Sequence, residues 1–148
     1  LEDPVLLPDG SLIYSEGDAN RPSKIIGIHT LGDVFSISGS QWVNEKAVEL
    51  FIRLVNHLQQ LKFKIIFVLV PYSPAVWDIA KQSGITELNA VESKVHEIAR
   101  LTGVQVIGSY NPSHIECTAD DFFNAAHPKA TCVTKIERVS VSYRTSKE

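Results

Sequence analysis

A near-continuous apolar run occupies residues 63–70 and stops sharply at Pro71-Tyr72-Ser73-Pro74. A run of this length and composition is typical of a β-strand that is covered on both faces, as strands of parallel sheets are. Such a strand needs helices on both sides of the sheet, so this segment restricts the chain to an α/β architecture.

Amphipathic helices are predicted on either side of this strand. The segment 41–61 has apolar side chains at steps of three and four. The segment 88–101 has the same periodicity and is ended by Gly103, a residue favoured after a helix. Residues 131–139 predict a last, shorter helix. In the first helix the apolar positions are Val43, Ala47, Leu50, Phe51, Leu54, Val55, Leu58 and Leu61.

Shorter apolar segments at residues 25–28 and 104–107 predict two more strands. The order is then strand, helix, strand, helix, strand, helix, which requires right-handed crossovers and a parallel sheet. The expected fold is a three-layer α/β/α domain of flavodoxin-like type, in which 25–28, 65–70 and 104–107 are neighbouring parallel strands.

The chain is expected to form a single domain over residues 1–148. Apolar residues around Asp9-Gly10 predict an N-terminal β-hairpin, which with a polar loop fills residues 1–23. The βαβαβα core spans residues 24–139, and residues 140–148 read as a frayed tail. The chain starts without Met, which favours a piece of a longer protein and gives no compartment.

Composition excludes several classes of function. A net charge of −3 and an isoelectric point near 6.0, with scattered basic residues, give no footprint for nucleic acid. No apolar run reaches the length of a membrane span. No glycine-rich phosphate-binding motif is present, so no nucleotide or other cofactor is expected. A resident metal is not expected, and zinc is only an alternative for the two cysteines discussed below.

A polar loop near the C-terminus carries the strongest candidate for chemistry. His127 follows Asn124 by three residues and precedes Pro128. The Asn side chain can accept a hydrogen bond from one ring nitrogen and leave the other free as a general base. Because ligands of open α/β sheets bind at the carboxyl ends of the strands, the loops 31–40, 71–78 and 108–130 are expected to gather around this histidine. An ordinary surface histidine beside two acids is the alternative.

The segment from Asp121 to Pro128 resembles the last sequence block of the SGNH (GDSL-like) hydrolases, Asp-x-x-His. The strand and helix pattern over residues 24–139 is similar to the later part of that fold. The resemblance implies hydrolysis or transfer of an acyl ester on a small molecule, a carbohydrate or a lipid, with His127 as base. The family aspartate falls on Asn124, so Asp121 is a candidate to stand in for the missing carboxylate.

The nucleophile block of the family, Gly-Asp-Ser, is not found in this chain. Gly32-Asp33 has the outline of this nucleophile block, but Val34 stands in the serine position. The pair fits the family's third block better, which supplies an oxyanion donor, although the Asn of that block is missing. Tyr72 and Ser73 follow a strand at the same edge and are candidates to line the cleft. The alternatives are that Ser73 only forms a turn between Pro71 and Pro74 and that Tyr72 only caps the apolar core, and these alternatives are favoured. The resemblance then implies a serine outside this chain, or a non-catalytic module that binds a glycan or a protein partner in the same cleft. Other serines that reach this edge are Ser36, Ser38 and Ser40.

Two cysteines bracket the histidine loop. A disulfide between Cys117 and Cys132 would hold the loop and imply an oxidising compartment, the periplasm or the outside of the cell. Two unrelated thiols are the first alternative. The second is zinc, bound by both cysteines with His114 and His127, although their spacing matches no known zinc pattern.

Overall fold

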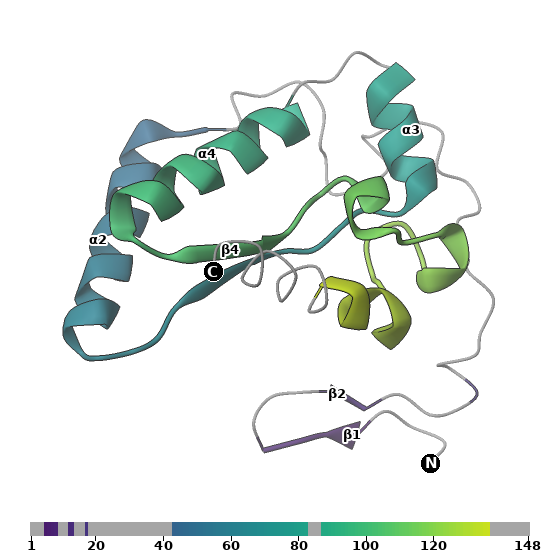
Figure 1. The fold of residues 1–148 in the computed structure, drawn as a ribbon, viewed down its shortest axis with the longest axis horizontal. Helices are drawn as coiled ribbons and strands as arrows, with labels where there is room; N and C mark the ends of the chain where they lie inside the picture. Colours follow the sequence, from purple (N-terminus) through teal and green to yellow (C-terminus); the bar gives the residue numbers. More distant parts are fainter. Residues whose placement is uncertain (1–4, 9–11, 14–16, 18–42, 83–86, 137–148) are drawn as a thin grey trace, which may run out of the picture.

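The structure is a computed structural model that describes residues 5–8, 12–13, 17, 43–82 and 87–136. Helices and a small parallel sheet form its main body, which has a mixed α/β architecture (Figure 1). The predicted strand 25–28, the loop 31–40 and the tail 140–148 lie outside the described residues.

The sheet joins β3 (Ile66–Leu69) to β4 (Gln105–Gly108) in parallel. Ile66 lies opposite Gln105 and Leu69 opposite Gly108, so the two strands end together. This pairing confirms that the apolar segments 65–70 and 104–107 are neighbouring parallel strands.

Two long helices pack against each other beside this sheet: α2 (Glu45–Gln60) and α4 (Glu87–Thr102) (Figure 1). Asn44 caps the start of α2 by accepting a hydrogen bond from the backbone N–H of Ala47 at 3.1 Å. Gln59 joins the far ends of the two helices through its side-chain N–H, which donates to the Thr102 carbonyl at 2.9 Å. Both helices confirm the prediction from the apolar periodicity of residues 41–61 and 88–101.

A third helix, α3 (Pro74–Gln82), begins three residues after Pro71. The expectation that residues 71–78 form a loop is therefore wrong beyond Ser73. Proline is well suited to the first position of a helix, because that position needs no backbone N–H. Pro71 thus follows the strand, and Pro74 begins a helix. Two 3-10 turns follow β4, η2 (Pro112–Ile115) and η3 (Ala119–Asp121), and residues 130–136 are helical up to the last described position.

The two faces of β3 differ in their cover. Phe67 contacts Phe51 of α2, with ring centroids 5.5 Å apart, and Leu69 is only 3% exposed. On the opposite face Val68 is 51% exposed. The expectation of a strand covered on both faces is not met for β3, because Val68 is exposed on the face opposite Phe67. On β4 the same face is partly covered, since Ile107 packs against the cluster that contains Cys132 and Ile136.

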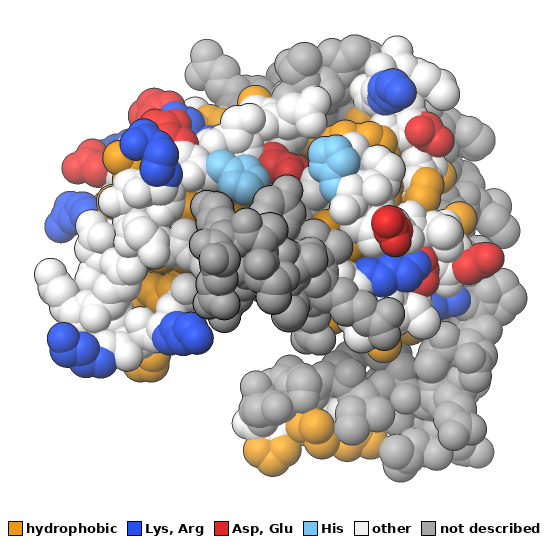
Figure 2. All heavy atoms as spheres, in the orientation of Figure 1, with side chains coloured by type: hydrophobic (Ala, Val, Ile, Leu, Met, Phe, Trp, Pro, Cys, Tyr) orange, Lys and Arg blue, Asp and Glu red, His pale blue; other side chains and the backbone are white. Residues whose placement is uncertain are grey.

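A separate two-stranded antiparallel ribbon is formed by β1 (Val5–Leu6) and β2 (Leu12–Ile13). It lies below the α/β body in Figure 1, and apolar side chains are visible on it in Figure 2. On the face seen in Figure 2, acidic and basic side chains of the main body are intermixed. Among the described helices, none is both long and apolar enough to cross a membrane.

Candidate active site

The segments that leave β3 and β4 meet at the carboxyl end of the sheet. The backbone N–H of Tyr72 donates to the carbonyl of Tyr110 at 3.1 Å, directly after the paired strands. The next N–H, that of Ser73, donates to the carbonyl of Ala125 at 3.0 Å. The start of the predicted loop 71–78 and the loop 108–130 therefore lie together, as expected, whereas 31–40 is outside the described residues.

The loop that carries the candidate histidine is closed by its own backbone. The N–H of Phe123 donates to the His127 carbonyl at 2.9 Å, and the N–H of Lys129 donates to the Asp121 carbonyl at 2.7 Å. Phe122, which bridges to Pro128, is fully buried and anchors the loop in the core. The buried ring of Phe122 thus anchors the loop, in which residues 124–126 are partly buried and His127 is exposed.

Asn124 and His127 contact each other within this loop. The Oδ1 atom of Asn124 lies 2.8 Å from Nδ1 of His127. The same oxygen accepts the backbone N–H groups of Ala126 and His127, each at 3.1 Å. Because two N–H donors already point at this atom, it must be the amide oxygen rather than the nitrogen. His127 therefore carries its proton on Nδ1, and Nε2 is left with a free lone pair.

A hollow of about 290 Å³ lies beside His127 at the ends of the strands. The rings of Tyr72 and Tyr110 lie 5.8 Å apart at this hollow. Burial raises the pKa of Tyr72, and burial together with Tyr72 and Glu92 raises the pKa of Tyr110. Both phenols therefore stay protonated at neutral pH and can donate hydrogen bonds. The hollow is lined by Val68, Val70, Pro71, Tyr72, Tyr110, Ala126 and His127.

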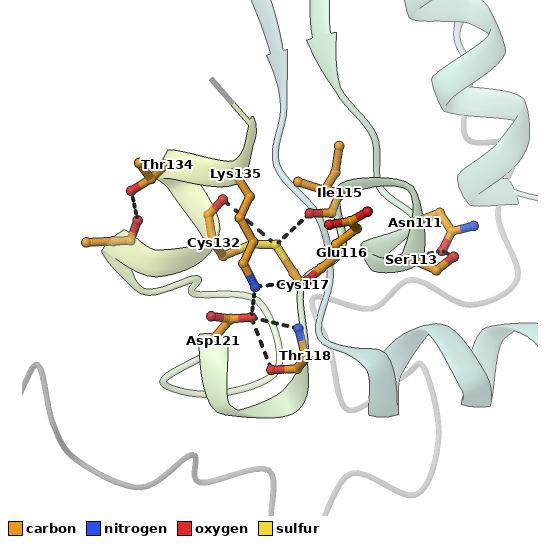
Figure 3. The surroundings of a disulfide bond; sticks show 11 residues. Asn111, Ser113, Ile115, Glu116, Cys117, Thr118, Asp121, Cys132, Thr134 and Lys135 are labelled. Carbon is orange, nitrogen blue, oxygen red and sulfur yellow. Dashed lines mark hydrogen bonds and ion pairs between the residues drawn. A yellow bond between two sulfur atoms is a disulfide. The ribbon is translucent and has the colours of Figure 1, made fainter. Parts of the chain in front are cut away.

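The structure does not bring the Asp121 carboxylate to His127. Its Oδ2 accepts the Lys135 ammonium at 2.7 Å, the Thr118 backbone N–H at 2.8 Å and the Thr118 hydroxyl at 3.1 Å (Figure 3). Burial alone would raise the pKa of Asp121, but hydrogen bonds from Lys135, Thr118 and Thr131 outweigh burial and hold the pKa well below its usual range. Asp121 thus supports the loop, and the amide of Asn124 is what contacts the imidazole.

Cys117 and Cys132 form a disulfide, with their Cα atoms 5.4 Å apart (Figure 3). This confirms the predicted pairing across the histidine loop. Both sulfurs are buried in a cluster with Ile115, Phe122 and Ile136. Because the cysteines are bonded to each other, neither offers a thiolate to zinc, and the zinc alternative is wrong. Within the described ranges no group of three or more His, Cys, Asp or Glu side chains could hold a metal ion.

The remaining candidates differ in what the structure shows of them. Gly32 and Asp33 lie outside the described residues. Tyr72 lines the hollow beside His127, as the sequence suggested. Ser73 is fully buried, and its hydroxyl has no hydrogen-bond partner among the described residues. What Ser73 contributes is its backbone N–H, which donates to the Ala125 carbonyl and holds the histidine loop against the end of β3.

Sequence reasoning missed Tyr110 and a Ser–His contact in the same loop. The Ser109 hydroxyl lies 3.1 Å from Nδ1 of His114 and accepts the N–H of Asn111 at 3.1 Å. Ser109 is 4% exposed, so this contact orders the start of the loop. Tyr110 could have been found, because it directly follows a predicted strand at the edge where ligands bind.

Comparisons of the chain with models of known families, with curated proteins and with solved structures find no match.

Proposed function

We propose that this chain is an SGNH-like hydrolase domain that supplies the general base for hydrolysis or transfer of an acyl ester. The observation that carries the proposal is the Asn124–His127 contact of 2.8 Å at the carboxyl ends of β3 and β4. It leaves Nε2 as a proton acceptor on a side chain that lines a hollow. The substrate class is a small-molecule, carbohydrate or lipid ester.

The proposed chemistry needs a nucleophilic serine, and the Gly-Asp-Ser block that carries it in the family is not found in this chain. Nε2 of His127 takes the serine proton as the oxygen attacks the ester carbonyl, and Nδ1–H stays bonded to Asn124. The imidazolium then gives its proton to the leaving alcohol, and water or a second alcohol releases the acyl group by the same two transfers. The phenols of Tyr72 and Tyr110 are donors available beside this reaction.

An amide in place of the family carboxylate weakens this base. In serine hydrolases, exchanging the carboxylate for an amide lowers turnover about 10⁴-fold, mainly through the wrong histidine tautomer. Here the backbone N–H groups of Ala126 and His127 turn the amide oxygen toward the imidazole, which supports the right tautomer. The negative charge is still missing. That lack favours the second candidate function, a non-catalytic module that binds a glycan or a protein partner in the same hollow.

The finer architecture belongs to the same proposal. In a three-layer SGNH-like fold, residues 25–28, which lie outside the described part, would pair in parallel with β3 through a right-handed crossover that includes α2. The Cys117–Cys132 disulfide supports an oxidising compartment, the periplasm or the outside of the cell.

The test is ester hydrolysis by the purified 148-residue chain. We expect no turnover of nitrophenyl acetate or butyrate, because the nucleophile block is missing. If the chain does hydrolyse these esters and His127→Ala abolishes the turnover, the chain must contain its own nucleophile, and the proposal that the nucleophile lies outside it is wrong. A polypeptide with a Gly-Asp-Ser block ahead of this domain should hydrolyse these esters, and His127→Ala should lower its turnover by at least about 10³-fold. A polypeptide that stays inactive even with Asn124→Asp would favour the binding module.

A further inference from the structure

A second cleft, of about 510 Å³, lies between α3, the start of α4 and η2. It shares no lining residue with the hollow beside His127. Its floor is apolar and buried, and its volume falls within the range of small-molecule sites, about 300–1,000 Å³. The floor is made by Ala80, Leu88, Pro112 and Cys117.

The walls of this cleft combine an aromatic ring with polar side chains. Trp77 is half-buried and packs against the cluster of Val76, Ala80 and Leu88, so its ring is held in place. Asn111 uses its Oδ1 to accept both the backbone N–H and the hydroxyl of Ser113, at 3.1 and 2.7 Å. This contact fixes the side chain and leaves the amide nitrogen as a donor.

Three further side chains of the wall are exposed: Asp78, Lys81 and Asn89. Within the described part of the chain, none of the three makes a side-chain hydrogen bond or ion pair. One acid and one base balance each other in charge, so the cleft has no preference for an anion or a cation. Amide, carboxylate and ammonium groups together offer both donors and acceptors.

We propose that this cleft binds a neutral carbohydrate. A sugar ring has an apolar C–H face, which matches the Trp77 ring and the buried floor. Its hydroxyls donate and accept, which matches the carboxylate of Asp78 and the amides of Asn89 and Asn111 in the wall. The proposal is independent of the chemistry at His127, because the two sites share no residue.

The test uses the fluorescence of Trp77. The chain has two tryptophans, and Trp42→Phe leaves Trp77 as the only one, whose emission is read with excitation at wavelengths that tyrosine does not absorb. Maltotriose, cellotriose and triacetylchitotriose serve as probes, and at least one should change the emission in a saturable way. Should Trp42→Phe fail to fold, the indole N–H resonance of Trp77 in the native chain gives the same readout.

Variants at the wall show whether the response comes from this cleft. Asn89→Ala and Asp78→Ala should each raise the dissociation constant about tenfold, because each removes one hydrogen-bonding group. Matched controls are Asn56→Ala and Asp120→Ala, exposed positions outside the cleft that should bind as the native chain does. The proposal is overturned if no probe binds at millimolar concentration, if the wall variants bind like the native chain, or if inorganic phosphate binds and the sugars do not.

Discussion

At the scale of single residues, the orientation of one amide decides what His127 can do. The Asn124 oxygen serves three groups at once: two backbone N–H groups and the imidazole. A side chain with three contacts to one atom has little freedom to turn its nitrogen toward the ring. The spacing in the sequence predicted the pair, whereas the backbone contacts that fix its orientation became visible only in the folded loop.

Asp121 leads to a prediction about acid sensitivity. Asp121→Asn should lower the free energy of unfolding at pH 7 by about 2 kcal/mol, because charged hydrogen bonds to Lys135 and Thr118 are weakened. The pKa of Asp121 is lowered in the folded state. Its stabilisation is therefore complete above the unfolded carboxyl pKa of about 4 and is lost as the pH falls toward the folded value.

Urea unfolding at a series of pH values measures this effect. The difference between native chain and variant should stay constant above about pH 5 and narrow below about pH 4. The control is Asp120→Asn, an exposed neighbour that should behave like the native chain. A difference that does not narrow at acid pH would contradict the role given to this carboxylate.

At the scale of elements, periodicity predicted what local sequence determines. The apolar runs of β3 and β4 and the stripes of α2 and α4 gave the right element types. Helix α3 was missed because Pro74 looks like a loop residue and fits a helix only at the first position. The open face of β3 could not be predicted, because cover depends on which segments pack there.

Gly108 gives the prediction at this scale. It ends β4 with a φ of +83°, and a Cβ atom there would collide with the Leu69 carbonyl oxygen on β3. Gly108→Ala should therefore destabilise the protein by about 3 kcal/mol. Gly103 is the matched control, since its φ is +68° but the space around it is open. Gly103→Ala should cost only about 1 kcal/mol.

Thermal or urea unfolding of the two variants provides the comparison. If Gly108→Ala and Gly103→Ala lower the free energy of unfolding equally, Gly108 is needed only for its backbone angle. In that case the close approach of the ends of β3 and β4, which positions Tyr72 against Tyr110, would be in doubt.

At the scale of the whole molecule, one covalent link holds the C-terminal region to the rest of the body. The disulfide joins the segment after η2 to the helical residues 130–136, and Lys135 adds its contact with Asp121 across the same region (Figure 3). The histidine loop lies between the two cysteines. Its geometry is therefore maintained by a covalent link as well as by the buried Phe122.

Reduction of this disulfide should lower the free energy of unfolding by about 3 kcal/mol, the chain-entropy value for a loop of about 15 residues. Urea unfolding with and without reductant measures the change. The double variant Cys117→Ala, Cys132→Ala is the control and should not respond to reductant. Protein from an oxidising compartment should show no thiol after denaturation, and two free thiols would argue against the link and against that compartment.

The central claim is that Asn124 holds His127 with its proton on Nδ1 and its lone pair on Nε2. Long-range proton–nitrogen NMR of the imidazole, at a pH where the ring is neutral, distinguishes the two tautomers directly. We expect the Nδ1–H form in the native chain and in Asn124→Asp, which keeps the acceptor, and a shift toward the Nε2–H form in Asn124→Ala. A native His127 with its proton on Nε2, or one whose tautomer is unchanged in Asn124→Ala, would contradict the account.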